Sequence, residues 1–133
     1  MALKDFTFRG KTLAELQALE VNELLPLFNS RTRRSLARGV NKKLLQKIDR
    51  VLAAKKDGKD PKPVRTHLRQ FIILPKMVGL KFAIYRGNAF EITEIMPEMI
   101  GSYLGEYQLT RKRVAHGKAG IGATKSSSAI TAK

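Results

Sequence analysis

The side chains of this chain that could do chemistry are mostly cations. The last 27 residues hold six Lys and Arg and no Asp or Glu, and they are rich in Gly, Ser and Thr. Such a segment has no counter-charge of its own and too few large apolar side chains to form a core. Its chemistry is the neutralisation of a polyanion, and we expect the segment to be disordered until it binds one.

Side chains for catalysis or metal binding do not form a recognisable set. The two histidines, His67 and His116, stand in separate basic neighbourhoods without the spacing of a metal site. Glu91 and Glu94 would point to opposite faces of a strand, which argues against a catalytic carboxylate pair. The chain has no cysteine, which removes thiol nucleophiles, disulfides and cysteine-ligated zinc. We therefore predict no catalytic residue, no metal site and no cofactor.

Two short motifs near the C-terminus are similar to phosphate-binding loops but fail in detail. A Walker loop needs glycine before its lysine, and Thr124 stands before Lys125. The dinucleotide fingerprint that would begin at Gly120 needs a third glycine at the position of Lys125. We interpret these glycines as letting the backbone approach another surface closely.

The net charge of +15 is unevenly distributed along the 133 residues. Lys and Arg minus Asp and Glu give +13 over residues 31–81 and +6 over 107–133, but −1 over 1–30 and −3 over 82–106. Two basic zones around an acidic one favour a protein that lies in a nucleic-acid groove.

A membrane is the other common partner of a basic chain. The sequence has no Trp and no lipidation motif, its longest apolar runs are four residues, and it begins without the apolar stretch of a signal peptide. We expect an intracellular protein that does not bind a membrane.

Helices are predicted in the N-terminal half. Thr12 and Glu15 form a capping box ahead of leucines at helical spacing, and a second turn is expected over residues 22–28. Residues 31–38 are expected to be helical up to Gly39. Asn41 is the expected N-cap of the strongest helix, whose polar face carries lysines that meet either solvent or phosphate.

The character changes to β after a predicted linker over residues 55–63. Residues 68–74 end in Phe-Ile-Ile-Leu, a run typical of a strand covered on both faces and ended by proline. Residues 82–84 and 90–92 predict two strands joined by a tight turn at Arg86-Gly-Asn88. Residues 97–100 predict one helical turn.

Four blocks of sequence resemble the family of small ribosomal subunit protein nineteen in its archaeal and eukaryotic form. They cover most of the chain in the right order, and the N-terminal helices are similar to the extension that distinguishes this form. The blocks are Ile73-Leu-Pro-Lys-Met-Val-Gly79, Pro97-Glu-Met-Ile-Gly-Ser-Tyr-Leu-Gly-Glu-Tyr107, Thr110-Arg-Lys-Arg-Val-Ala-His-Gly117 and Gly120-Ile-Gly-Ala-Thr-Lys-Ser-Ser127.

The resemblance implies a non-catalytic constituent of the small-subunit head that binds ribosomal RNA beside protein thirteen. Its tail would extend toward the decoding region and possible contact with tRNA, and it would not form a homo-oligomer. The implied fold is α+β, with a small, mainly antiparallel three-stranded sheet, helices packed on it and a basic tail. We divide the chain into helical residues 1–64, a sheet-containing core at 65–106 and a tail at 107–133, in a cytoplasmic, ribosomal protein.

The candidate RNA-binding residues come from the basic zones and the resemblance. The polar helix face gives Lys43 and Lys47, and the same zone gives Arg65 and Arg69. The resemblance implies RNA contact near the sheet and along the tail. Those residues are Lys81, Arg86, Asn88, Arg111, Lys112, Arg113, His116, Lys118 and Lys125.

Other functions remain open at this point. Residues 31–38, Gly39 and the helix after Asn41 have the spacing of a helix-turn-helix, which would make the chain a DNA-binding protein. That alternative leaves the sheet and the acid-free tail unexplained. An enzyme acting on RNA is a third hypothesis, without any motif to support it. A tail that acts through charge alone is a fourth.

Overall fold

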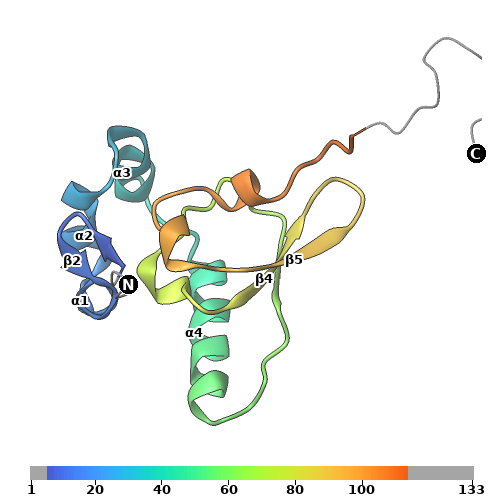
Figure 1. Cartoon of the computed structure of the whole chain (residues 1–133), viewed down its shortest axis with the longest axis horizontal. Coiled ribbons are helices and arrows are strands. Elements are labelled where there is room, and N and C mark those ends of the chain that lie inside the picture. The colour runs from blue at the N-terminus through green and yellow to red at the C-terminus, as the bar shows by residue number, and fades with distance from the viewer. Residues whose placement is uncertain (1–5, 114–133) are drawn as a thin grey trace, which may run out of the picture.

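The computed structural model describes residues 6–113 and has the α+β fold that the sequence predicts. Helices α1 to α3 gather at one end of the molecule and the β4–β5 hairpin lies at the other, with α4 between them (Figure 1). The helices are α1 (Leu13–Ala18), α2 (Val21–Leu24), α3 (Ser30–Ala37) and α4 (Lys42–Lys56). The strands are β1 (Thr7–Phe8), β2 (Lys11–Thr12), β3 (Val64–Thr66), β4 (Lys81–Tyr85) and β5 (Phe90–Glu94). The 3-10 turns are η1 (Leu25–Leu27), η2 (Pro75–Met77), η3 (Pro97–Met99) and η4 (Leu104–Tyr107).

The helix ends follow the capping residues of the sequence. Glu15 accepts a hydrogen bond from the backbone N–H of Thr12 at 2.8 Å, as its place in the capping box predicts. Asn41 Oδ1 accepts from the N–H of Leu44 at 3.1 Å and begins α4. Gly39, with φ of +114°, follows α3 and allows the chain to turn before α4. The predicted helices at both sites are confirmed.

Two N-terminal features of the structure differ from the elements that the sequence predicts. The turn expected over residues 22–28 is α2 followed directly by η1, with Pro26 at the start of η1. A two-stranded hairpin of β1 and β2 precedes α1 and was not predicted. Its turn holds Arg9 and Gly10, both with positive φ, and the two-residue strands are too short to show alternation.

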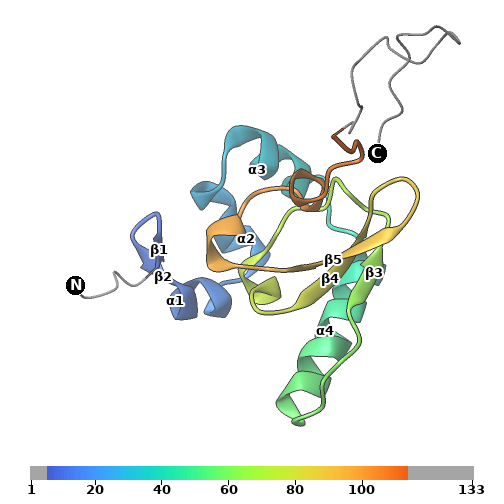
Figure 2. The same ribbon diagram turned by 45° about the vertical axis from the view of Figure 1, so that its right-hand side comes forward.

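The main sheet has the order β3-β4-β5. β4 and β5 are antiparallel and joined by the predicted turn, where Gly87 has φ of +109°. β3 is parallel to β4, with Val64 opposite Phe82. The chain crosses between these two strands through residues 67–80, and α4 packs against β3 (Figure 2).

The predicted strand at residues 68–74 is wrong. Phe71 to Leu74 are all buried, as the apolar run indicated, but the segment is extended chain outside the sheet and forms a single bridge from Ile72 to Tyr103. Its backbone bonds go to the segment after β5, for example from Ile73 N to Ser102 O at 2.9 Å. A segment that is buried on both sides is a continuous apolar run whether or not it pairs with a neighbouring strand, so the run alone does not indicate a strand.

The predicted linker is shorter than expected, because α4 continues to Lys56. Lys55 Nζ donates to the carbonyl of Gly79 at 2.8 Å, which fixes the last turn of α4 against the chain that leads into β4. The irregular segment therefore begins at residue 57.

One hydrophobic core joins the N-terminal helices to the sheet. It runs from Leu16 to Leu104 and includes side chains of α1, α3, α4, β3 and β4. Gly101 lies so close to Phe28 that an added Cβ would be 3.2 Å from the ring. The sheet thus leans on the helices, as its small size predicted, while the proposed domain boundaries remain a prediction.

Candidate nucleic-acid interface

The outer face of the main sheet carries aromatic and basic side chains. Phe82 and Ile84 face the core, so the alternate residues of β4, and their neighbours on β3 and β5, point outward. Tyr85 pairs with Phe90 across the hairpin, and their ring centroids are 5.2 Å apart. His67 joins them, with centroids 4.4 Å from Tyr85 and 5.0 Å from Phe90. We call these three side chains the aromatic trio.

A basic hollow adjoins the aromatic trio. The guanidinium carbon of Arg65 lies 4.3 Å from the centroid of Phe90. Lys43 and Lys47 of α4 line a hollow of about 250 Å³ together with Arg65 and His67, which we call the α4–β3 hollow. The fold therefore brings together three candidates that lie up to 22 residues apart in the sequence.

The cations of the α4–β3 hollow are not neutralised within the described protein. Within residues 6–113 the one ion pair joins Arg86 to Glu91, so Lys43, Lys47 and Arg65 have no carboxylate partner there. All three side chains are exposed. Unpaired cations beside aromatic rings are the combination that binds phosphates and unstacked bases.

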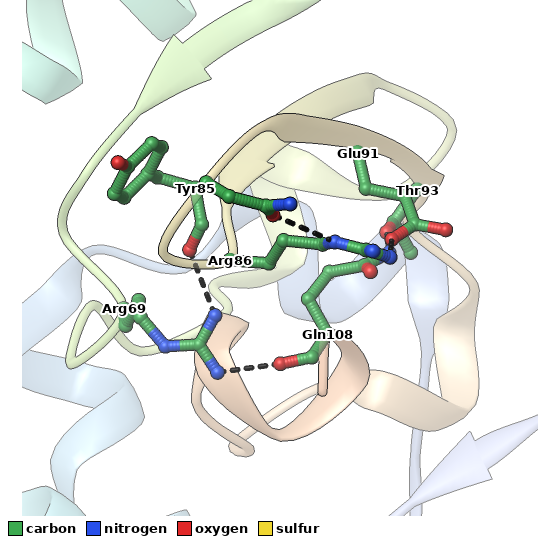
Figure 3. Close-up of polar contacts among 7 residues, drawn as sticks. Arg69, Tyr85, Arg86, Glu91, Thr93 and Gln108 are labelled. Atoms are coloured by element: carbon green, nitrogen blue, oxygen red, sulfur yellow. Dashed lines mark hydrogen bonds and ion pairs between the residues drawn. The ribbon is translucent and has the colours of Figure 1, made fainter. Parts of the chain in front are cut away.

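Arg69 has a different environment from the other candidates. Its guanidinium is partly buried and donates to the carbonyls of Tyr85 at 2.8 Å and of Gln108 (Figure 3). It also donates to the carbonyl of Gly105 at 2.7 Å. Gln108 in turn donates to Thr93 of β5. Arg69 therefore ties the segment after η4 to the β4–β5 hairpin, and most of its donors are occupied inside the protein.

The remaining sheet candidates lie at the two ends of β4. Arg86 and Asn88 are in the hairpin turn, where Arg86 Nη1 contacts Glu91 at 2.7 Å (Figure 3). Arg86 Nε also donates to Asn88 Oδ1 at 3.3 Å. An ion pair this close to the surface contributes only about 0–1 kcal/mol, so a phosphate could replace the carboxylate. Lys81 is exposed at the start of β4, opposite Glu94.

The tail candidates are only partly within the described residues. Arg111, Lys112 and Arg113 are exposed. His116, Lys118 and Lys125 lie outside the described residues, so their predicted role is not tested.

The aromatic trio is the part of this surface that the sequence reasoning missed. Tyr85 and Phe90 flank the predicted turn, and a one-to-one hairpin register would have paired them on one face. The place of His67 could not be predicted, because the third strand was assigned to the wrong residues.

The described residues can also be searched for a membrane-spanning helix and for a metal site. None of the described helices is both long and apolar enough to cross a membrane. Residues 6–113 contain no cluster of three His, Asp or Glu side chains that could hold a metal ion.

Comparison with known proteins gives matches over most of the chain. Residues 34–116 match the family model described as ribosomal protein S19. The small ribosomal subunit protein uS19 of Halorubrum lacusprofundi is 45% identical over 130 residues, which cover 98% of this chain and 92% of that protein. The protein of the same name from Halobacterium salinarum is 47% identical over 133 residues, with 97% and 92% covered.

Proposed function

Because this chain belongs to the ribosomal protein S19 family, we propose that its basic, aromatic face binds small-subunit ribosomal RNA in the head of the subunit. Membership makes the chain a structural, non-enzymatic constituent of the small ribosomal subunit, located on the ribosome in the cytoplasm. The predictions of the family and of a protein without enzymatic activity are thereby confirmed. The helix-turn-helix alternative is not needed.

The observation that carries the proposal is the α4–β3 hollow beside the aromatic trio. Lys43, Lys47 and Arg65 supply charge that no carboxylate of residues 6–113 neutralises, and the rings of the trio supply flat apolar surface next to it. Each cation that contacts a phosphate releases condensed counterions, which gives affinity without sequence preference. Rings stack on bases that are not paired, so the two features together suit structured RNA with unpaired nucleotides.

The hairpin and the tail would extend this contact along the RNA. In our proposal Lys81, Arg86 and Asn88 contact the backbone near the sheet, while Arg111, Lys112 and Arg113 continue the contact beyond η4. The tail, including His116, Lys118 and Lys125, would reach toward the decoding region and the tRNA there. Arg69 is left out of the RNA contact because its donors are engaged with carbonyl groups.

A protein neighbour would occupy the β5 edge of the same outer face, beyond Phe90 of the aromatic trio. Ile92 is 61% exposed on β5 and Met96, which follows it with the same alternation, is 52% exposed. Exposed apolar side chains of this kind are typical of the centre of protein interfaces. We assign this edge to the contact with protein thirteen in the subunit head.

The test removes the two helix lysines and measures RNA affinity against salt. We expect the Lys43→Gln/Lys47→Gln double variant to bind cognate small-subunit ribosomal RNA, transcribed in vitro, more weakly than the unchanged protein. The slope of log affinity against log salt should become less steep by about 1.4 to 1.8, because two phosphate contacts are lost.

A matched control removes the same charge from another place. Lys56 and Lys59 are exposed and lie outside the α4–β3 hollow, so Lys56→Gln/Lys59→Gln should change the slope little. Equal slopes for the two double variants would show that net charge alone, and not this surface, determines binding.

A further inference from the structure

A second hollow adjoins the α4–β3 hollow, with which it shares the lining residues Asn41 and Leu68. It has a volume of about 680 Å³ and is open to solvent between α3, the segment at residues 68–72 and the segment at residues 103–106. Arg31 of α3 and Tyr103 line it, and the Arg31 guanidinium carbon lies 5.3 Å from the centroid of the Tyr103 ring. We call this hollow the α3 groove.

One side of the α3 groove continues into a row of arginines. Arg31 and Arg34 of α3 and Arg38, the residue directly after α3, recur at helical spacing on one exposed face, where they line an adjoining hollow of about 490 Å³. Within residues 6–113 none of the three forms an ion pair. Arg33, on the same helix, donates to the carbonyls of Leu25, Pro26 and Phe28 instead. The row can therefore contact phosphates, and Arg33 serves to fix α3.

The walls of the α3 groove also include polar side chains. Gln70 and Asn41 carry amides there, and Glu106 adds one carboxylate that can accept from the amino group of a base. The wall opposite α3 is fixed, because Arg69 donates to the carbonyl of Gly105. A Cβ at Gly105 would lie 3.0 Å from Arg69 Cβ, so the two segments are already in close contact.

We propose that the α3 groove binds one unpaired nucleotide of ribosomal RNA, with its base against the Tyr103 ring and the Arg31 guanidinium and its flanking phosphates on Arg34 and Arg38. A phenol ring and a guanidinium plane are the surfaces on which splayed-out bases stack. Three arginines that no carboxylate of residues 6–113 neutralises match a polyanion better than a protein segment. The inference rests on the proposed function, because it adds a second contact on the same RNA.

The absence of Trp from this chain provides a local probe. In a Tyr103→Trp variant the only indole of the protein lies in the α3 groove. Titration with cognate small-subunit ribosomal RNA, transcribed in vitro, should quench its fluorescence and protect it from acrylamide. An Ala14→Trp variant, with the probe on an exposed position of α1, should show neither effect.

A second variant measures the contribution of stacking without a probe. Tyr103→Leu keeps an apolar side chain and removes the ring, so RNA affinity should fall about five- to a hundredfold. The salt slope should stay the same, because no phosphate contact is lost. Circular dichroism and urea unfolding of each variant establish that it has folded.

The outcomes separate this inference from the proposed function. If RNA binds the Tyr103→Trp variant with the expected salt slope while the indole stays unquenched, the α3 groove is not a nucleotide site and the α4–β3 hollow stands. Protection of the indole that occurs only in assembled subunits, and not with RNA alone, would assign the groove to a protein and also overturn the inference. Failure of the unchanged chain to bind RNA would overturn both proposals.

Discussion

At the scale of single residues, the arginine side chains have three distinct environments. Arg33 and Arg69 donate to backbone carbonyls, Arg86 pairs with a glutamate, and Arg31 and Arg65 lie over aromatic rings. The carbonyl acceptors of Arg69 are 16 to 39 residues away in sequence. No local pattern marks such acceptors, so the sequence could indicate a basic zone but could not separate structural arginines from binding ones.

Arg69 gives a prediction at this scale. Arg69→Met keeps an unbranched apolar stem but leaves three carbonyl groups without their donor. Because each hydrogen bond to a charged group contributes roughly 1.5–3 kcal/mol and such bonds do not add fully, the free energy of unfolding should fall by about 2–4 kcal/mol. Urea unfolding of the full chain measures this change.

The control for that prediction is an exposed arginine on α4. Arg50→Met removes the same charge at a surface position and should change the free energy of unfolding by no more than about 0.5 kcal/mol. If Arg69→Met were as stable as the unchanged chain but bound RNA poorly, Arg69 would be an RNA contact after all.

At the scale of elements, the predictable part of the fold is the part with local causes. Some features depend only on residues that are close in sequence, and the structure confirms them. They are the helix caps at Thr12 and Asn41, the apolar periodicity of α4 and the glycine of the β4–β5 turn. The pairing of β3 with β4 joins residues that are 18 positions apart. β3 is only three residues long, too short for alternation to reveal it, and the more apolar segment at residues 68–74 has the stronger strand pattern.

The same limit applied to the candidate site. Lys43 and Lys47 can be predicted because they share a helix face, and Arg65 because of its charge. Their meeting in one hollow follows from the packing of α4 against β3, which requires the correct third strand.

Strand β5 gives a prediction at this scale. Ile92→Lys places a charge where we propose that protein thirteen binds, so affinity for that protein should fall about tenfold or more in a binding assay with both purified proteins. The side chain is mostly exposed, so the free energy of unfolding should change by less than about 0.5 kcal/mol. RNA affinity should not decrease.

An Ala18→Lys variant serves as the control, because it adds the same charge at an exposed position of α1. If both variants weakened the protein contact equally, the effect would come from net charge. If Ile92→Lys weakened RNA binding instead, β5 would belong to the RNA face and the two edges of the sheet would have to be reassigned.

At the scale of the whole molecule, the folded core ends close to the point where the acid-free tail begins. The described hydrophobic core ends at Leu104, close to the last acidic residue, Glu106. The residues beyond it add charge but, as far as Arg113, no buried apolar side chain. The acid-free tail therefore adds cations without adding to the core, separately from the cations that the folded part carries in the α4–β3 hollow.

That separation predicts the effect of removing residues 114–133. The free energy of unfolding should change by less than about 0.5 kcal/mol, because the deletion takes nothing from the described core. RNA affinity should fall and the salt slope should become less steep by about 2 to 3, since Lys118, Lys125 and Lys133 are lost. Urea unfolding and RNA titrations at several salt concentrations measure the two quantities.

A variant of the whole chain with those three lysines changed to Gln separates the contribution of the tail's charge to RNA affinity from the contribution of the rest of its sequence. If the segment acts only through charge, the variant and the deletion should lose the same affinity. We expect the deletion to lose more, because the glycines from Gly117 to Gly122 let the backbone approach RNA closely and remain in the Gln variant. A deletion that left the salt slope unchanged would show that the tail does not contact this RNA, and its proposed path toward the decoding region would then fail.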